Sequence, residues 1–318
     1  MTNGKYAYIF SNKKNITIDG NGSTIICNRQ NQAFQFSNCE NVTFKNFVVE
    51  YDPPCASQGT IVEMSADKRT WTVELHENYP TTGIQNDRIL VYDKENRELK
   101  QNFTTISASG MTTQTVGTST RLKFTSSWSN TATNPVVVGD YVSFSVVAEG
   151  NIQAHTFIIS SCKYMRFENV TVYDSNSFSF LEYDGLQNHY YRCIVTRKLN
   201  DPKYPQDRLR AGIADAFHSK YAEIGPILEE CRLEYTGDDC IAINGNFYPV
   251  YETNAIDNTV SFLTTANSLA NVYVRANDKF VCVNNDGTIR GRAVVTNVSL
   301  AYPTQAQRDA TFAKLSQM

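Results

Sequence analysis

The sequence has 318 residues, of which 41% are hydrophobic, 12% aromatic and 19% charged, and its formal net charge is -3. This length allows one extended domain with insertions, or two ordinary domains. The chain has no basic surplus to neutralise phosphates and no apolar run long enough to span a membrane. We therefore expect neither a nucleic-acid partner nor a membrane partner. Residues 1–5 are not followed by the apolar core of a secretory signal.

Residues 1–56 contain short alternating strands bounded by turn residues. The segment 15–18 (NITI) precedes the turn 19–22 (DGNG), and a longer copy, FQFSNCENVTFKNFVVEYD, starts at Phe34. Val, Ile, Thr and Phe in alternation, bounded by Asn, Gly, Asp or Ser, are typical of strands and turns. We interpret this part as the first coils of a β-helix.

Residues 57–145 interrupt the pattern with longer alternating strands, such as 70–75 and 88–92. The Ser/Thr-rich sequence from Thr112 to Thr133 has the composition of loops. We expect a small inserted β-barrel here.

The repeat resumes over residues 146–250. FIISSCKYMRFENVTVYDS, from Phe157, aligns with the copy from Phe34, so that Phe167 matches Phe44, and weaker copies follow at 190–195 and 228–233. Units this short cannot bury their inward side chains alone, so the copies must stack, about 4.8 Å apart. The sequence therefore predicts an all-β protein, a right-handed parallel β-helix with two inserted small β-barrel-like modules. An all-β sandwich would explain the strands but not the repeats in register.

The second insert covers residues 251–300, and its core matches the first insert when Asn277 is aligned with Asn86. The tail, residues 301–318, has helical composition. A bare β-helix end would expose strand edges, so either the tail caps the stack or the chain is a piece of a longer protein.

Eight cysteines are present, and no two have CxxC spacing, so a zinc site is not expected. Most lie in β-rich sequence, which favours small buried hydrophobic residues. We expect Cys193 and Cys231 to be buried and unpaired, and we expect neither a metal nor another cofactor.

Three aspartates form the sharpest local pattern. Asp215 lies in ADAFHS, Asp238 and Asp239 lie in TGDDCIAI, and Asp239 follows Asp215 by one coil, since 239 − 215 = 24. Stacked coils would hold these two carboxylates roughly 5 Å apart, and Gly237 can relax the backbone so that Asp238 joins them. Crowded carboxylates repel one another, which leaves a protonated acid beside ionised bases, as glycoside hydrolysis requires. A solvated turn or a calcium site are the alternatives.

The sequence TGDDCIAI resembles the active-site signature of the pectin-lyase-like β-helix glycoside hydrolases, such as the polygalacturonases. Together with IDGNGSTIIC, the passage 50–61, the barrel inserts and ADAFHS, the chain is most similar to the bacterial α-1,3-galactosidases of glycoside hydrolase family 110. This resemblance implies a secreted or periplasmic bacterial enzyme that removes terminal α-linked galactose with inversion. Asp238 would be the general acid, and Asp215 and Asp239 would position the attacking water. The GHG and RIK motifs of polygalacturonases are absent, so a pectin substrate is not expected.

Other polar residues are candidates for binding an oligosaccharide or polysaccharide substrate. They are His218, Arg208, Arg210, Glu182, Tyr183 and Asp184. The simpler alternatives are a structural histidine and solvated arginines. Two further functions stay open: a polysaccharide lyase or epimerase, which would need a Lys, Arg or His base not apparent beside the aspartate pair, and a non-catalytic carbohydrate-binding or tailspike-like β-helix. The sequence does not indicate an oligomeric state.

Overall fold

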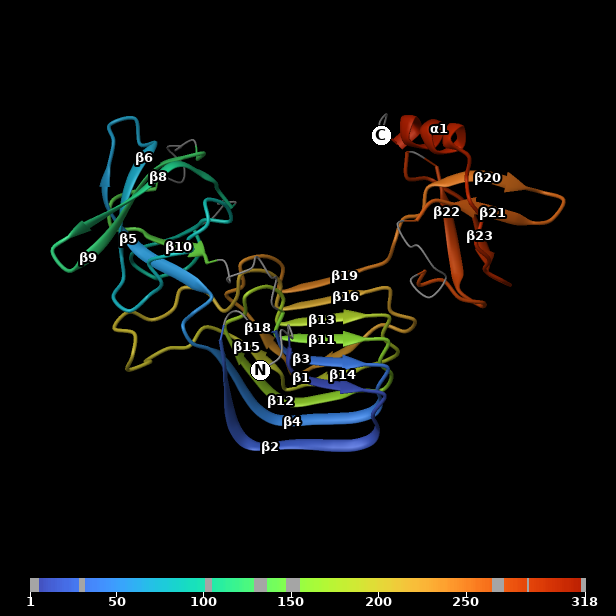
Figure 1. Cartoon of the computed structure of the whole chain (residues 1–318), viewed down its shortest axis with the longest axis horizontal. Coiled ribbons are helices and arrows are strands. Elements are labelled where there is room, and N and C mark those ends of the chain that lie inside the picture. The colour runs from blue at the N-terminus through green and yellow to red at the C-terminus, as the bar shows by residue number, and fades with distance from the viewer. Residues whose placement is uncertain are drawn as a thin grey trace. The chain divides into compact units, whose positions relative to one another are not determined.

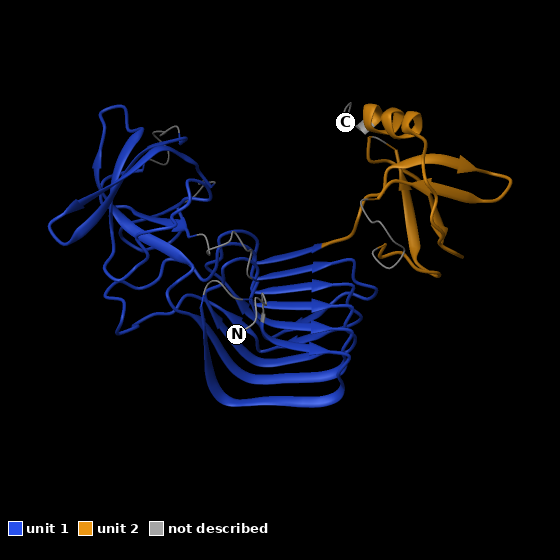
Figure 2. Cartoon of the chain, in the orientation of Figure 1, with its two compact units in different colours: residues 1–243 blue, residues 244–318 orange. Residues whose placement is uncertain are grey.

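The computed structural model describes residues 6–28, 32–100, 105–128, 136–146, 155–264, 272–284 and 286–315. The chain divides into two compact units, residues 1–243 and 244–318 (Figure 2). Strands make up almost all of the regular structure in the described part of the chain (Figure 1). In the same part, no helix is both long and apolar enough to cross a membrane.

Two parallel sheets form the coiled part of the larger unit, and the chain passes repeatedly from one to the other. The first sheet contains β1 (Tyr6–Ser11), β3 (Gln32–Ser37), β11 (Phe157–Ser160), β13 (Phe180–Tyr183), β16 (Phe217–Lys220) and β19 (Ile241–Asn244). The second contains β2 (Lys14–Cys27), β4 (Glu40–Tyr51), β12 (Arg166–Tyr173), β14 (His189–Tyr191), β15 (Ile194–Val195), β17 (Ile227–Glu229) and β18 (Arg232–Leu233). Because β3 leads into β4 and β11 into β12, the stacked strands are those of a β-helix (Figure 1).

The register of the strands confirms the repeat seen in the sequence. Phe157 pairs with Phe34 in the first sheet, and Phe167 pairs with Phe44 in the second. Inside the coil the rings stack, with centroids 4.9 Å apart for Phe34 and Phe157 and 4.8 Å apart for Phe157 and Phe180. These separations match the spacing of neighbouring strands, so each coil places its apolar side chains directly over those of the coil before.

Asparagines occupy corners of the coils where the backbone adopts positive φ angles. Asn46 has φ 60° and Asn169 has φ 52°, a conformation that asparagine tolerates better than most residues. The side-chain amide of Asn169 donates to Asn46 Oδ1 at 3.2 Å, and that of Asn46 donates to Asp19 Oδ1 at 2.9 Å. These ladders of side-chain hydrogen bonds satisfy polar groups at the corners, which the two sheets do not cover.

An antiparallel module, residues 56–145, lies between β4 and β11. Its strands are β5 (Ala56–Met64), β6 (Thr70–Leu75), β7 (Leu90–Tyr92), β8 (Ala108–Val116), β9 (Ser119–Ser126) and β10 (Tyr141–Ser145). The module has its own core, which includes Trp71, Phe124 and Phe144. It packs on the β-helix through a small cluster of Leu90, Tyr92 and Leu209.

The prediction of loops over 112–133 is wrong for much of that segment. Strands β8 and β9 form a hairpin there, turning at Gly117, whose φ is 61°. Threonine has high β propensity, and glycine allows the tight turn, so the composition suits strands as well as loops. Residues 129–135 of that segment lie outside the described residues.

The smaller unit contains two antiparallel strand pairs and a helix. They are β20 (Val250–Asn254) with β21 (Thr259–Phe262), β22 (Lys279–Val283) with β23 (Ile289–Val294), and α1 (Gln305–Leu315). The helix falls in the tail that has helical composition.

The cysteines are free thiols, as expected for Cys193 and Cys231. Cys193 is buried, but the prediction that Cys231 is also buried is wrong, because it is only partly covered. Its thiol donates to Tyr190 O at 3.2 Å. Cys231 lies close to the end of the stack, where fewer coils remain to cover it.

Candidate active site

Asp215 lies at the corner that leads into β16, directly between two neighbouring coils. Its carbonyl oxygen accepts from Ser179 N at 3.0 Å, and the next residue, Ala216, donates its N–H to Asp239 O at 3.1 Å. Phe217 N then donates to Cys240 O at 3.2 Å. In a parallel ladder this pattern places Asp239 in register with Asp215, one coil further along.

Gly237 allows the chain to make the tight corner that carries Asp238. A Cβ at this position would lie 2.3 Å from Ile213 O and 3.0 Å from Gly212 O, so any other residue would collide with the backbone of the coil beneath. The glycine is therefore required for close approach of two backbones. The aspartate pair follows at once on the exposed side of this corner.

The three aspartates differ in their surroundings. Asp215 is only 4% exposed, whereas Asp238 keeps 53% of its side chain exposed. Burial raises the pKa of Asp215, and the charges of Asp238 and Asp239 raise it further, while the hydrogen bond and charge of His218 oppose the change. Asp239, in register with Asp215, and the adjacent Asp238 therefore place two further carboxylates on the coil next to Asp215.

His218 is held against Asp215. Its Nδ1 lies 2.6 Å from Asp215 Oδ2, and its ring packs on Phe178 with centroids 4.8 Å apart. Phe178 in turn stacks on His155 at 5.0 Å. Because Nδ1 is engaged with the carboxylate, this atom serves to position Asp215 and is not available for a sugar hydroxyl.

Sequence reasoning missed His155, although the repeat contains a signal for it. His155 precedes Phe157 by two residues, just as Asp215 precedes Phe217, so both belong to the same column of the coil. Its Nδ1 accepts a hydrogen bond from Phe178 N at 3.2 Å, and burial lowers the pKa of His155 to about 4. The imidazole is therefore neutral at neutral pH.

The antiparallel module also contributes a residue to this corner. Arg88 immediately precedes the segment leading into β7, and its Nη1 lies 3.7 Å from Asp238 Oδ2. The sequence separates the two by 150 positions (238 − 88 = 150), and no repeat relates them. Arg88 therefore lies beside the aspartate pair, where no basic residue is apparent from the sequence.

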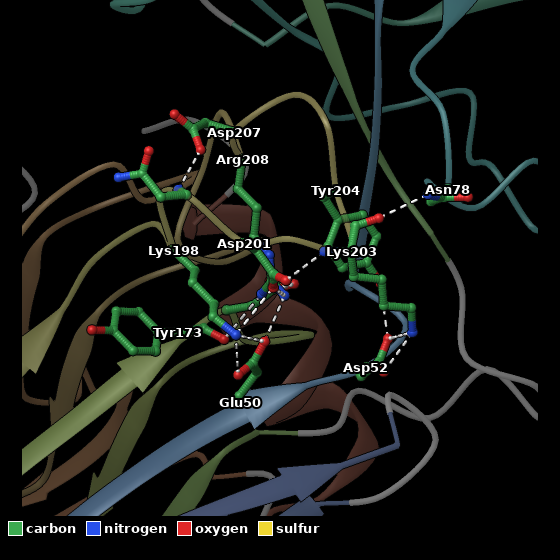
Figure 3. A network of polar contacts seen from close by, with 12 residues as sticks. Glu50, Asp52, Asn78, Tyr173, Lys198, Asp201, Lys203, Tyr204, Asp207 and Arg208 are labelled. Atoms are coloured by element: carbon green, nitrogen blue, oxygen red, sulfur yellow. Dashed lines mark hydrogen bonds and ion pairs between the residues drawn. The ribbon is translucent and has the colours of Figure 1, made fainter.

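Arg208 belongs to a buried ion network, and its role in substrate binding stays a prediction. Its Nη2 lies 2.9 Å from Glu50 Oε1, and its Nη1 lies 3.6 Å from Asp174 Oδ2. Lys198 reaches the same Glu50 at 2.9 Å (Figure 3). These ion pairs connect the loop before β16 to the end of β4. Glu50 is buried, and a buried carboxylate requires positive charges beside it.

Arg210 is equally buried, so it is not a solvated arginine either. It is 2% exposed, and burial lowers the pKa of its guanidinium. Tyr92, Asp174 and Arg88 are close enough to influence its charge. Among the described residues, none hydrogen-bonds to its Nε, Nη1 or Nη2.

The remaining three candidates, Glu182, Tyr183 and Asp184, lie further along the coil than the aspartate corner, and their role in substrate binding stays a prediction. Tyr183 is in register with Lys220, five residues beyond Asp215 in the neighbouring coil, which corresponds to about 16 Å of extended chain. Glu182 is fully buried inside the coil. Asp184 accepts a hydrogen bond from Ser161 Oγ at 2.9 Å.

A separate surface hollow lies over the second sheet. It is lined by Asn169, Thr171, Arg192, Ile194, Glu230 and Arg232. Its carboxylate, Glu230, already accepts from Arg192 at 2.6 Å. We favour the aspartate corner as the candidate active site because Asp238 and Asp239 both act electrostatically on the buried Asp215 there.

No family model matches the chain. Part of the chain is nevertheless similar to two α-1,3-galactosidases of Bacteroides thetaiotaomicron. It is 32% identical to α-1,3-galactosidase B over 83 residues, which are 26% of this chain and 13% of that protein. It is 39% identical to α-1,3-galactosidase A over 54 residues, 17% of this chain and 10% of that protein. The matched part therefore spans only a small fraction of either relative.

Among solved structures, the chain aligns over 76% of its length with 53% of the Gp54 tailspike of Acinetobacter baumannii bacteriophage AP22, in complex with A. baumannii capsular saccharide. The identity is 10% and the TM-score is 0.23. A similarity this loose supports no inference about function.

Proposed function

We propose that this protein is an inverting glycoside hydrolase that removes terminal α-linked galactose, or a related sugar, from glycans. Its scaffold would be a right-handed parallel β-helix that carries two small β-barrel-like modules. The observation that carries the proposal is the buried Asp215, in register with Asp239 and under the electrostatic influence of both Asp238 and Asp239. The partial similarity to α-1,3-galactosidases supports the same reaction class.

In the proposed mechanism, Asp238 protonates the oxygen of the leaving group, while Asp215 and Asp239 hold the attacking water. The raised pKa of Asp215 suits a base, because a carboxylate that holds its proton more tightly is a stronger acceptor once it is ionised. His218 fixes the orientation of Asp215 through the 2.6 Å contact. Inversion requires roughly 6.5–9.5 Å between acid and base, so that water fits beside the sugar.

The test combines a substrate screen with three single substitutions. Purified protein is incubated with aryl α-galactosides and with galactose-terminated oligosaccharides, and proton NMR follows the anomer released first. We expect β-galactose to appear first from an α-linked substrate. Asp238→Asn should lower turnover of oligosaccharides by at least ~100-fold and of activated aryl substrates by less, since a good leaving group needs less protonation.

Asp215→Asn and Asp239→Asn should lower the turnover of both substrates alike, because attack by water is common to both. Glu77→Gln, which changes an exposed carboxylate of the antiparallel module, is the matched control and should leave turnover unchanged. If Asp215→Asn instead spares the activated substrate, the acid and base roles are reversed. Wild-type turnover in all three aspartate variants would refute the hydrolase.

A lyase or epimerase is the second candidate, and the proximity of Arg88 to Asp238 is the observation that favours it. A cation beside a carboxylate pair can neutralise a uronate while a base removes its proton. An unsaturated product, detected by its ultraviolet absorption, would identify a lyase. Binding of the oligosaccharide without any turnover would instead favour a carbohydrate-binding β-helix.

A further inference from the structure

Two arginines of the same loop, Arg208 and Arg210, are equally buried but differ in their partners. Both are 2% exposed. Arg208 has Glu50 at 2.9 Å and Asp174 at 3.6 Å, whereas the three nitrogens of the Arg210 guanidinium lack a hydrogen-bond partner throughout the described part of the chain. The two arginines can be compared directly, because only Arg208 forms ion pairs with neighbouring carboxylates.

A buried cation without a partner is strongly unfavourable for folding. The nearest carboxylate, Asp174, does not relieve it, because Asp174 already faces Arg208 and accepts hydrogen bonds from Cys55 N and Ser175 N. Groups that break a rule of packing in this way are found mainly at functional sites. Arg210 therefore requires an explanation other than stability.

The position of Arg210 connects it to the aspartate corner. The next residue, Ala211, donates its N–H to Tyr235 O at 2.7 Å, so Arg210 lies one coil below the segment that turns at Gly237 into Asp238. On the other side, Leu209 packs on Leu90 and Tyr92 of the antiparallel module. Arg210 thus lies at the junction between this module and the coil.

Arg88 lies at the same junction and reaches the surface. It precedes Leu90 by two residues, is 47% exposed, and approaches Asp238 to 3.7 Å. Arg88 therefore places a positive charge beside Asp238, and Arg210 lies close enough to Arg88 for the two charges to influence each other, while Asp215 and Asp239 carry negative charge on the neighbouring coils. A charge buried at low dielectric is screened less than one in water, so the field of Arg210 extends to this surface.

We propose that Arg88 and Arg210 form an anion subsite that recognises a carboxylate or sulfate ester on the leaving-group part of the glycan. This inference rests on the proposed role of Asp238 as the acid, which places the leaving group on the Arg88 side. Arg88 contacts the anion, and Arg210 acts through its field from beneath. The carboxylates of Asp215 and Asp239 repel an anion from the sugar that is cleaved, so the preference applies to the leaving group alone.

Binding is measured by calorimetry in the Asp215→Asn background, so that turnover does not interfere. The ligands are three galactose-terminated oligosaccharides of equal length, with a neutral, a sulfated or a uronate leaving-group sugar. We expect the anionic ligands to bind about tenfold more tightly than the neutral one, with a preference that weakens in salt. Comparison of the affinities of the sulfated and uronate oligosaccharides then shows which anion the subsite prefers.

Arg88→Gln should abolish the preference, whereas Arg192→Gln, which removes an exposed arginine from the second sheet, should keep it. Equal affinity for all three oligosaccharides would overturn the proposal. This readout needs no turnover, so it remains informative if the protein hydrolyses nothing, and an active enzyme without the preference would refute only the subsite.

Arg210→Met provides a second, independent readout. Because it removes an unpaired buried charge and keeps much of the side-chain volume, we expect its unfolding midpoint to rise by about 2–4 °C while the anion preference falls. A lower midpoint would mean that Arg210 stabilises the fold, and it would overturn the assignment of Arg210 to the subsite. An unchanged anion preference in this variant would do the same.

Discussion

The buried carboxylate of Glu182 has several hydrogen-bond partners, unlike the buried guanidinium of Arg210. Glu182 lies in the interior of the coil, where its carboxylate accepts from Asn188 Nδ2 at 2.8 Å, Tyr190 Oη at 2.9 Å and Ser219 Oγ at 2.9 Å. Burial nevertheless raises its pKa, because these hydrogen bonds do not fully replace water. Glu182 and Arg210 are both almost inaccessible to solvent, and they differ in the number of their hydrogen-bond partners.

The raised pKa of Glu182 predicts how stability depends on pH. The protonated carboxyl favours the fold below the ordinary pKa of 4.5, and this contribution is lost as the pH rises through the higher pKa of the folded state. Glu182→Gln keeps a neutral side chain at every pH. We therefore expect this variant to be more stable than the wild type near pH 8 and to lose the advantage near pH 4. Urea unfolding at both pH values measures this, and a larger advantage at the acidic value would contradict it.

At the scale of the element, asparagine ladders stabilise the corners of the coil. Asn46 combines a φ of 60° with hydrogen bonds to Asp19 and Asn169, so the residue serves the backbone and the side-chain ladder together. The two contributions can be separated, because glycine tolerates the same φ but has no amide.

Asn46→Ala should lose both contributions and destabilise the protein by about 2 kcal/mol, while Asn46→Gly should lose only the hydrogen bonds, about 1 kcal/mol. The free energy of unfolding in denaturant gives both values. If alanine is tolerated as well as glycine, the positive φ is not a constraint at this corner.

At the scale of the whole molecule, the stack is well covered in its middle and open at β19. Ile159 and Ile243 belong to the same inward column, since Ile159 pairs with Glu182, Glu182 with Ser219, and Ser219 lies 24 residues before Ile243 (243 − 219 = 24). Ile159 is completely buried, whereas Ile243 is 59% exposed. The same residue type therefore has different surroundings at the two levels.

Ile159→Thr should destabilise the protein by about 2–4 kcal/mol, because it buries a hydroxyl and removes a methylene from the core. Ile243→Thr should change stability by less than about 1 kcal/mol, since its side chain already meets water. Thermal or denaturant unfolding of the two variants provides the comparison. Equal destabilisation would show that the β19 end is covered in solution.

Periodicity was sufficient to predict the stacking of coils and the register of Asp215 with Asp239. A β-helix repeats its local environment every coil, so the alignment of Phe157 with Phe34 in the sequence is also an alignment in space. The same repeat contained His155, which a column-by-column reading would have found. The prediction of inserted modules came from the change in strand pattern at residue 57, and their barrel-like form stays a prediction.

Only the tertiary structure decided the contacts that do not repeat from coil to coil. Arg88 approaches Asp238 only because the antiparallel module packs on the coil through Leu90, Tyr92 and Leu209, a contact between surfaces that no spacing in the sequence encodes. Arg208 and Arg210 are two residues apart in one polar loop, yet one is paired and the other is not. Their difference depends on where Glu50 and Asp174 arrive from distant strands. The short-range pattern of the sequence therefore specified the stacked coils and the register of Asp215 with Asp239. Long-range packing, by contrast, placed Arg88 beside Asp238.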